Sequence, residues 1–468
     1  MDKRIIKPYV EKFFNYQVLP NLMDFIRIPN CSPNYDTDWE KNGYALNAAN
    51  FLCDWVDRLN IKDCSVNLLK DEGHTPFIYV DIKPTKKDDD RTILLYGHLD
   101  KQPAFTGWSD GLGPQKPVIL DNKLYGRGSS DDGYAIFASI TSVKACQDNN
   151  YPIPRVVILI EGAEESNTVD LLYYVQQLKP LIGDPSLIVC LDSGCEDYER
   201  LWVTTSLRGV FTIDLKVSVL SQGIHSGAGG GVVPDTFMII RQIIDRIENY
   251  ETADILVNEL QTELPKNRET EIEDLIKISG DEYLKNFPWY GKTKPLDPTI
   301  KRTIIRNTWK PALVITGAEG YPDSDTAGNL IQPFSKLRLS IRLPPGIDSH
   351  KGAEIVKEIL EKDPPYGAKI DANILNTGDG WNLSSFSNRL KNILNISSQR
   401  FFDNNIAFFG EGGSIPFVQL FNSTFTNADI AVIGVCGPDS NIHGPNENLN
   451  MDFCQKLIMC LTYLVSEY

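Results

Sequence analysis

The sequence has no long hydrophobic run and no excess of basic residues, and both absences narrow its possible functions. No stretch approaches the roughly 18 consecutive apolar residues of a membrane-spanning helix, so no membrane segment is expected. Acidic residues outnumber basic ones by 62 to 46, which gives a net charge of −16. Surfaces that bind nucleic acid or anionic membranes are usually basic, so neither partner is expected.

Cysteine and histidine are sparse. The nine cysteines form no CxxC pair and are odd in number, so we expect no disulfide framework and a reducing, cytoplasmic location. The first 22 residues mix charged and apolar side chains and predict an amphipathic helix, not a secretory signal. Only five histidines are present, and two of them, His98 and His443, follow predicted strands. These two are therefore the first candidates for chemistry.

Four short runs are apolar almost throughout, which is typical of strands buried on both faces of a parallel or mixed sheet. They are residues 92–96, 155–160, 186–191 and 429–435. Helical patterns lie between them, for example at 132–146 and 169–178. The alternation predicts an α/β layered domain.

The pattern changes between residues 207 and 376. It predicts strands at 211–219, 312–317, 336–343 and 369–375, and helices at 235–250 and 350–362. Ser349 is the expected N-cap of the second helix. Strand–helix–strand–strand–helix–strand is the split βαβ order of a small open sandwich, and residues 251–310 interrupt it as an insertion. The chain of 468 residues is thus predicted to contain an α/β domain, residues 1–206 and 377–468, interrupted by an α+β domain, residues 207–376.

Metal-binding side chains gather at the carboxyl ends of the predicted strands, where open α/β sheets bind their ligands. These side chains are His98, Asp100, Glu164, Glu165, Asp192 and His443, and Asp131 and Asp132 follow a GRGSS loop. Taken singly, each has an ordinary explanation as a helix cap or a solvated acid. Their convergence on one rim predicts a metal site. Imidazole and carboxylate ligands without thiolates suit zinc, with manganese or cobalt as alternatives.

Two short spacings suggest separate roles. His98 and Asp100 are two apart, so in an extended segment they point to the same side, and Asp100 can accept the second imidazole N–H. Glu164 and Glu165 are adjacent and cannot share one geometry. One of them can bind metal while the other acts as a general base, which typically contributes about 10²–10⁴-fold in rate.

Six motifs together resemble the M20 metallopeptidase family, particularly its carnosinase-like cytosolic dipeptidases. In the family's order they are GHLD (97–100), LYGRGSSDD (124–132), EGAEES (161–166), HSG (225–227), SIRL (340–343) and EGGSIP (411–416). The resemblance implies a zinc-peptidase-like α/β catalytic domain interrupted by a ferredoxin-like lid and dimerisation domain. It also implies two divalent metal ions, most often Zn²⁺ with Mn²⁺ or Co²⁺ possible, and a homodimer formed through the lid.

Carried over residue by residue, the resemblance implies a role for each part of the metal site. His98 and Asp192 would hold one ion, Glu165 and His443 the other, and Asp131 would bridge them. Asp100 would orient His98, and Glu164 would be the general base. The peptide bond after the bridging residue, between Asp131 and Asp132, would be cis.

The resemblance also implies six residues that act on the substrate. His225 would stabilise the carbonyl oxyanion, often across a dimer, and the others would contact substrate: Asn329, Arg342, Gly412, Gly413 and Ser414. Arg342 has a fork of donors suited to a carboxylate. Two positions depart from the family pattern: Gly133 replaces the usual Lys after the Asp pair, and Asn329 stands where carnosinase-like enzymes often have Thr. The second departure leaves the subfamily open.

Hydrolysis of dipeptides or short peptides with a free carboxylate is the leading functional hypothesis. The alternative is hydrolysis of N-acyl amino acids on the same machinery, as in succinyl-diaminopimelate desuccinylase or aminoacylase, for which Arg208 is a candidate extra cation. A catalytically silent binding protein is a third possibility. Retention of Glu164 and of every metal position counts against it.

Overall fold

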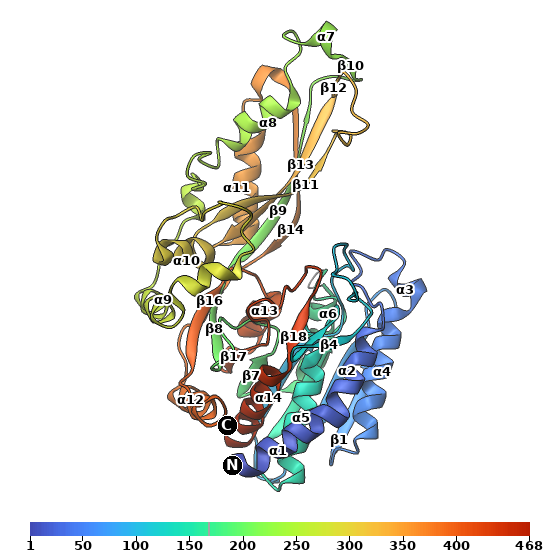
Figure 1. Ribbon diagram of the computed structural model, residues 1–468, viewed down its shortest axis with the longest axis vertical. Coiled ribbons are helices and arrows are strands. Elements are labelled where there is room, and N and C mark those ends of the chain that lie inside the picture. The colour runs from blue at the N-terminus through green and yellow to red at the C-terminus, as the bar shows by residue number, and fades with distance from the viewer. Residues whose placement is uncertain (167–168) are drawn as a thin grey trace. The chain divides into compact units, whose positions relative to one another are not determined.

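The computed structural model describes residues 1–166 and 169–468, and this part of the chain divides into two units (Figure 1). The first unit comprises Met1–Thr204, Leu383–Phe409 and Phe417–Tyr468. The second comprises Thr205–Asn382 and the short segment Gly410–Pro416. Each unit is built around its own sheet.

The sheet of the first unit is mixed. In spatial order its strands are β1 (Cys64–Leu69), β2 (Phe77–Ile82), β6 (Arg155–Glu161), β3 (Thr92–His98), β7 (Leu187–Cys190), β17 (Asp429–Val432) and β8 (Trp202–Leu207). Strands β15 (Trp381–Asn382) and β16 (Ala407–Glu411) pair with β8. The four central strands β6, β3, β7 and β17 are parallel and are the four apolar runs of the sequence. The predicted α/β sheet is therefore confirmed.

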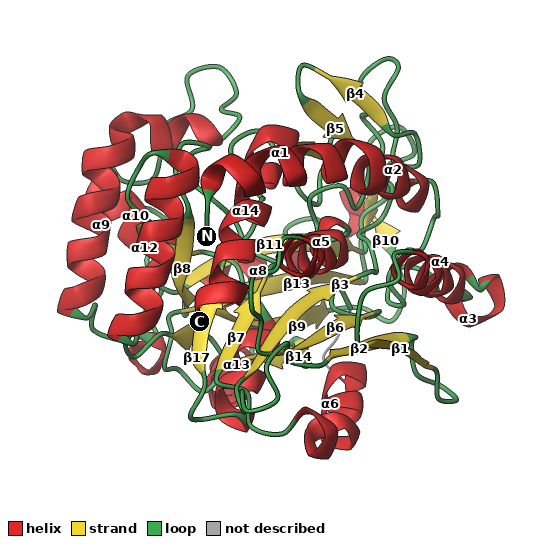
Figure 2. Cartoon of the chain, turned by 90° about the horizontal axis from the view of Figure 1, so that it is seen from below, coloured by secondary structure: helices red, strands yellow, loops and turns green. Residues whose placement is uncertain are grey.

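Helices cover both faces of this sheet (Figure 2). One face carries α1 (Lys3–Phe13), α2 (Leu19–Ile26), α4 (Tyr44–Arg58), α5 (Tyr134–Asp148) and α14 (Met451–Glu467), and α6 (Val169–Ile182) lies on the other. The first helices form as predicted, with Ile6 and Val10 buried, and a π-helical turn, Phe14–Val18, joins α1 to α2. Helix α5 is buried along most of its length because α14 packs against it.

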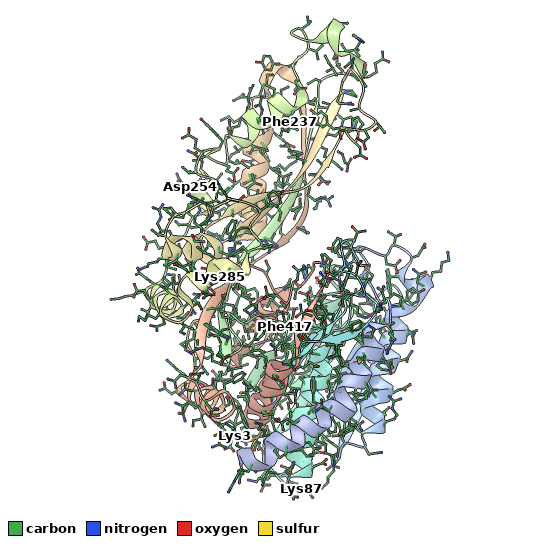
Figure 3. All side chains as sticks on the ribbon, viewed as in Figure 1. Lys3, Lys87, Phe237, Asp254, Lys285 and Phe417 are labelled. Carbon is green, nitrogen blue, oxygen red and sulfur yellow. The ribbon has the colours of Figure 1, made fainter. Side chains whose placement is uncertain are left out.

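The remaining elements of the first unit surround this core. They are α3 (Trp39–Asn42), α12 (Asn388–Phe402), α13 (Pro416–Thr424) and a small sheet of β4 (Val118–Leu120), β5 (Lys123–Tyr125) and β18 (Asn448–Asn450). Phe417 of α13, labelled in Figure 3, stacks on Tyr96 of β3 with ring centroids 3.4 Å apart. Strand β3 matters most for function, because it ends at the predicted metal ligand His98.

The second unit contains a four-stranded antiparallel sheet in the order β11 (Ala312–Glu319), β13 (Phe334–Leu343), β9 (Gly209–Ser218) and β14 (Lys369–Gly378). Burial alternates strictly along β9, as expected for a sheet with one covered face. The buried side chains of β9 pack with those of α8 (Thr236–Ile244) and α11 (Ser349–Glu361) in one core. The order and directions of these elements are those of the ferredoxin-like fold, which confirms the predicted fold class.

Insertions extend this unit. Between α8 and β11 lie the 3₁₀ turn Asn258–Leu260, α9 (Lys266–Ser279), the 3₁₀ segment Gly280–Asn286 and α10 (Ile300–Trp309). A short ribbon is formed by β10 (Ile224–His225) and β12 (Leu330–Ile331), followed by the single turn α7 (Ser226–Gly229). A last 3₁₀ turn, Pro365–Gly367, precedes β14.

Two local predictions are wrong. Asp348, not Ser349, is the N-cap of α11, because its side chain accepts the N–H of Lys351 at 2.9 Å while Ser349 is already helical. Helix α8 ends at Ile244, short of the predicted residue 250. Beyond it, the side chain of Asn249 accepts backbone N–H groups from the two residues that follow Tyr250, and such side-chain bonds compete with helix formation.

Two absences predicted from the sequence can be compared with the structure. Within residues 1–166 and 169–468, no helix combines the length and the hydrophobicity that a membrane crossing requires. None of the nine cysteines, all of which lie in these ranges, forms a disulfide.

Candidate metal centre

The predicted metal ligands of the first unit meet at Asp131. Its Oδ1 lies 3.1 Å from Nε2 of His98, and its Oδ2 lies 2.9 Å from Nε2 of His443. Asp192 approaches the same nitrogen of His98 at 3.8 Å, and Glu165 approaches Nε2 of His443 at 3.4 Å. One carboxylate thus stands between two imidazoles, and each imidazole has a second carboxylate beside it.

This arrangement fits divalent cations. The side chains form two possible ligand sets, and within each set the donor atoms lie within 4.8 Å of one another. One set is His98, Asp131 and Glu165, and the other is His98, Asp132 and Asp192. Glu165 Oε1 and Asp132 Oδ1 are buried and accept no hydrogen bond from the described residues. Buried carboxylates crowded together need a positive charge, and imidazole with carboxylate donors suits zinc, manganese or cobalt.

Asp132 belongs to one of these sets, although the sequence analysis did not assign it as a ligand of either ion. Its Oδ2 also accepts the backbone N–H of His98 at 3.1 Å. A side chain at position 97 would prevent this, because a Cβ on Gly97 would lie 2.6 Å from Asp132 Oδ2 and 2.4 Å from Ala135 Cβ. The glycine in GHLD therefore lets the end of β3 approach the start of α5.

The charges of the centre shift one another's pKa values strongly. Burial alone would lower the pKa of His98, but the carboxylates of Asp192, Asp100 and Asp131 raise it well above its usual value. Desolvation also opposes the charge of His443, but the nearby carboxylates of Asp131 and Glu165 raise its pKa to about 11. The site thus has a strongly negative potential, which stabilises any cation placed there.

Asp100 connects the histidine to the acidic turn. Nδ1 of His98 lies 3.1 Å from the carbonyl oxygen of Asp100 and 3.4 Å from its carboxylate. The same carboxylate accepts the backbone N–H groups of Glu164 and Glu165 at 3.1 and 3.0 Å. With Nδ1 donating to Asp100, Nε2 of His98 is left to bind metal.

Glu164 has the properties of a proton-transfer group. Burial and the charge of Asp192 raise its pKa well above the ordinary value of a carboxylic acid. Its backbone is held by Asp100, as described above, while its neighbour Glu165 faces His443. The two adjacent glutamates therefore differ in their surroundings.

The loop that carries Asp131 shows one feature expected from the resemblance and one departure from it. The peptide bond between Asp131 and Asp132 is cis. Gly133 departs from the family pattern because there is no room for a side chain: a Cβ there would lie 2.2 Å from the carbonyl oxygen of Gly128 and 2.6 Å from the ring of Phe25. No metal-binding residue is affected by this departure.

The predicted substrate-binding residues lie in the second unit. Nη1 of Arg342, on β13, donates to Ser414 Oγ at 2.9 Å, and Nε of Arg208 donates to the carbonyl oxygen of Gly412 at 3.0 Å. Gly413, between them, is exposed. The structure therefore brings Arg342 and the Gly412–Ser414 loop together.

His225 and Asn329 lie elsewhere in that unit. His225 is on β10, and Asn329 precedes β12; both are exposed. The carbonyl oxygen of Asn329 accepts the N–H of Ser226 at 2.9 Å, so the two predicted residues are neighbours. Their ribbon lies at the end of the unit opposite α9 and α10 (Figure 1).

Three further residues at the metal centre were missed by the sequence reasoning. Gln102 donates to Glu165 at 2.5 Å, and Arg127 and Glu447 form a buried ion pair of 2.6 Å. Gln102 continues the two-residue spacing of His98 and Asp100, which could have revealed it. Arg127 and Glu447 are 320 residues apart, and no local pattern connects them.

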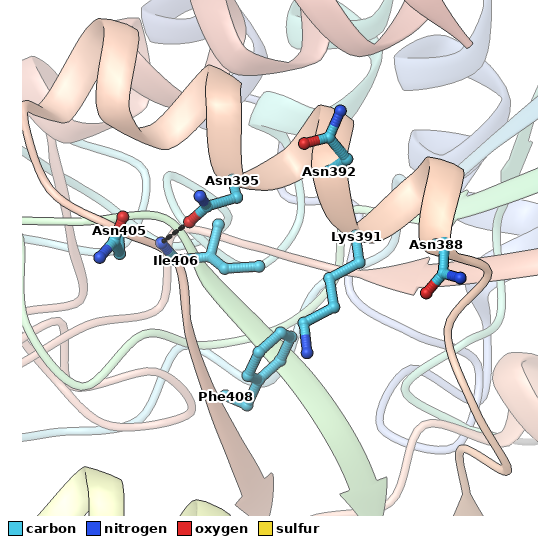
Figure 4. Close-up of a pocket in the computed structure, with 7 residues that line it drawn as sticks. All are labelled: Asn388, Lys391, Asn392, Asn395, Asn405, Ile406 and Phe408. Atoms are coloured by element: carbon cyan, nitrogen blue, oxygen red, sulfur yellow. Dashed lines mark hydrogen bonds between the residues drawn. The ribbon is translucent and has the colours of Figure 1, made fainter.

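Two hollows in the described parts lie outside this set of ligands. One, of about 440 Å³ in the first unit (Figure 4), is lined by Asn388, Lys391, Asn392, Asn395, Asn405, Ile406 and Phe408. Asn395 Oδ1 accepts the N–H of Ile406 there, and Lys391 packs over the ring of Phe408. The other, of about 300 Å³ in the second unit, is lined mainly by the 287–314 region together with Arg208. Neither contains a predicted metal ligand.

Comparison with known proteins identifies the family of this chain. Residues 94–467, from β3 to α14, match the family described as Peptidase family M20/M25/M40. The chain belongs to this family. It is 26% identical over 370 residues to the cysteinylglycine-S-conjugate dipeptidase of Corynebacterium striatum, covering 77% of this chain and 78% of that protein.

Other family members support the same assignment. The human Beta-Ala-His dipeptidase is 24% identical over 413 residues, which cover 85% of this chain and 80% of that protein. The crystal structure of human carnosine dipeptidase 1 has the same fold, with a TM-score of 0.82 at 20% identity over 99% of this chain and 98% of that one. The family match, residues 94–467, includes parts of both units.

Proposed function

We propose that the protein is a dinuclear metal-dependent dipeptidase. One observation carries the proposal: Asp131 stands between the Nε2 atoms of His98 and His443, at 3.1 and 2.9 Å, in the position of a ligand shared by two ions. The relatives named above as dipeptidases support a peptide substrate. We assign zinc to both positions, with manganese and cobalt as ions that the same donors accept.

The chain's own residues account for the proton transfers of hydrolysis. Divalent ions held by His98, Asp192, Asp131, Glu165 and His443 would supply Lewis acidity and lower the pKa of water. Glu164 accepts the proton of the attacking water at its carboxylate and then donates it to the nitrogen of the leaving amine. Its raised pKa favours the second step. Asp100 keeps Glu164 in place through the backbone N–H and keeps His98 in the required tautomer.

Arg342 is the proposed binding group for the free carboxylate of the substrate. Burial lowers the pKa of its guanidinium, and no carboxylate of the described residues pairs with it, although Ser414 accepts one of its N–H groups. A carboxylate bound by its fork would supply the missing negative charge. Gly412, Gly413 and Ser414 would line the cleft beside it, and a free carboxylate would then be a requirement for substrates.

His225 and Asn329 are proposed to act from a second copy of the chain. Within the second unit they lie on a ribbon at the end opposite α9 and α10 (Figure 1), whereas Arg342 pairs with Val210 at the start of β9. A homodimer formed through the second unit would allow His225 to donate to the carbonyl oxygen of the substrate, where a preorganised donor stabilises developing charge. The second unit would then serve as lid and dimerisation domain.

Hydrolysis assays with metal-loaded protein test the substrate class. We expect kcat/KM for a panel of dipeptides, including Cys-Gly and β-Ala-His, to exceed that for N-succinyl-diaminopimelate by at least about tenfold, a difference of about 1.4 kcal/mol in transition-state binding. Blocking the carboxyl end of the best dipeptide as an amide should remove most of its kcat/KM. Preference for the succinylated compound would instead assign the protein to the N-acyl hydrolases of the same family.

A further inference from the structure

We propose that Arg127 and Glu447 are positioning residues that hold two metal ligands, Asp131 and His443, in the relative position that metal binding requires. The inference concerns the metal centre of the proposed dipeptidase and rests on that function. Neither residue is a ligand. Their contacts reach the backbone on both sides of the site, in two segments that are far apart in the sequence.

Glu447 organises the loop that carries Asp131. Its Oε1 lies within hydrogen-bond distance of three backbone N–H groups, those of Gly128, Ser130 and Asp131, at 3.0, 3.2 and 3.3 Å. The hydroxyl of Ser130 donates to the same oxygen at 3.4 Å. A single carboxylate oxygen thus accepts hydrogen bonds from this loop as far as the proposed bridging ligand, Asp131. Neutral acceptors are weaker partners for such a set than a charged carboxylate.

Arg127 ties its own loop to the segment that carries both His443 and Glu447. Its Nη1 donates to Glu447 Oε2 at 2.6 Å. Its Nη2 donates to the carbonyl oxygens of His443 and Gly444 at 3.2 and 2.8 Å. Its Nε donates to the carbonyl oxygen of Pro103 at 3.1 Å. The planar guanidinium therefore joins its own loop to two others, the one at Pro103 and the one at residues 443–447, which a lysine with a single ammonium group could not do in the same geometry.

Burial makes this pair sensitive to substitution. Arg127 is 2% exposed and Glu447 0% exposed. Removing one member of a buried, hydrogen-bonded ion pair leaves the other charge uncompensated. The loops would then have to move to solvate it, and these loops carry the two ligand residues. Residues that orient ligands in this way commonly contribute 10–100-fold to metal affinity.

A second ion pair in the same unit provides a matched control. Arg155 donates to both carboxylate oxygens of Asp81, at 2.9 and 2.8 Å, and both side chains are largely buried. This pair joins β2 to the first residue of β6, whereas the metal ligands follow the carboxyl ends of strands. Disrupting it removes a less deeply buried ion pair of the same unit without touching a ligand loop. Its variants report what a loss of stability alone does to metal binding.

The experiment compares Glu447→Gln with Asp81→Asn. Metal-free proteins are titrated with Zn²⁺ against a chromophoric chelator, and their Co²⁺ complexes are examined by visible absorption. We expect Glu447→Gln to weaken the binding of at least one ion by about 10–100-fold and to change the Co²⁺ spectrum. Asp81→Asn should lower the unfolding midpoint while keeping wild-type affinity and spectrum. Arg127→Lys, paired with Arg155→Lys, repeats the comparison if Glu447→Gln does not fold.

The outcomes separate this proposal from the proposed function. Wild-type affinity and an unchanged spectrum in Glu447→Gln, or in Arg127→Lys, would overturn the positioning role. Equal losses of affinity in the control variants would overturn it as well, because they would show a general effect of instability. Failure of the metal-loaded wild type to cleave any dipeptide would refute the function instead, and the affinity comparison would still decide the role of the pair.

Discussion

Replacing Glu164 by glutamine is expected to lower kcat for the best dipeptide by about 10²–10⁴-fold, the usual contribution of a general base. The amide keeps the size of the side chain but cannot accept the proton of water. KM should change little, since Glu164 is not proposed to bind the ground-state substrate. Metal analysis of the purified variant should still give two ions per chain, because the proposed ligands are intact.

A nearby carboxylate supplies the control for this variant. Asp170 accepts hydrogen bonds from His74 and Thr75 and lies outside the metal centre, so Asp170→Asn should affect stability far more than kcat. Wild-type turnover by Glu164→Gln would show that another group takes the proton. Loss of metal from Glu164→Gln would show that this residue is a ligand and not the base.

Replacing Asp131 by alanine is expected to reduce the occupancy of both metal positions and to abolish hydrolysis. Its two carboxylate oxygens face different imidazoles, so one substitution removes a ligand from each ion. Metal content is measured after dialysis by elemental analysis, with the unfolding midpoint recorded in parallel.

Asp192 provides the comparison for a ligand that serves one ion only. It approaches His98 at 3.8 Å, and no contact with His443 is expected from the proposed arrangement. Asp192→Ala should therefore lose about one ion per chain, as a terminal ligand of a single ion would. If Asp131→Ala also lost one ion and kept the other at full occupancy, Asp131 would be a terminal ligand and the bridging role would be wrong.

The sequence predicts the sheet well because its strands depend on short patterns, and the candidate ligands are placed by those same strands. Runs such as residues 92–96 are apolar on both faces, and a strand buried on both faces requires that. His98 follows such a run directly, so its place at the rim follows from the strand itself. The structure places it there, 3.1 Å from Asp131. The roles of base, bridge and terminal ligand came from the family resemblance and stay predictions.

The errors and omissions have local physical causes. Asp348 and Ser349 are both good N-cap residues, and the sequence does not say which one leaves the helical conformation. Helix α8 ends early because the backbone after it pairs with a later segment: the N–H of Asn249 donates to the carbonyl oxygen of Asp254 at 2.9 Å, and Glu248 forms an antiparallel bridge with Ile255. Glu447 was missed because its partners belong to a loop more than 300 residues away. Only the tertiary fold brings those groups together.

Removal and stepwise return of metal would test the dinuclear centre most directly. The protein is treated with a chelator, and dipeptide hydrolysis is followed as Zn²⁺ or Mn²⁺ is added back. We predict negligible activity in the metal-free protein and a rise that reaches its plateau at two equivalents of metal per chain, with the unfolding midpoint increasing over the same range. Activity that survives complete metal removal, or that saturates at one equivalent, would contradict the proposed centre.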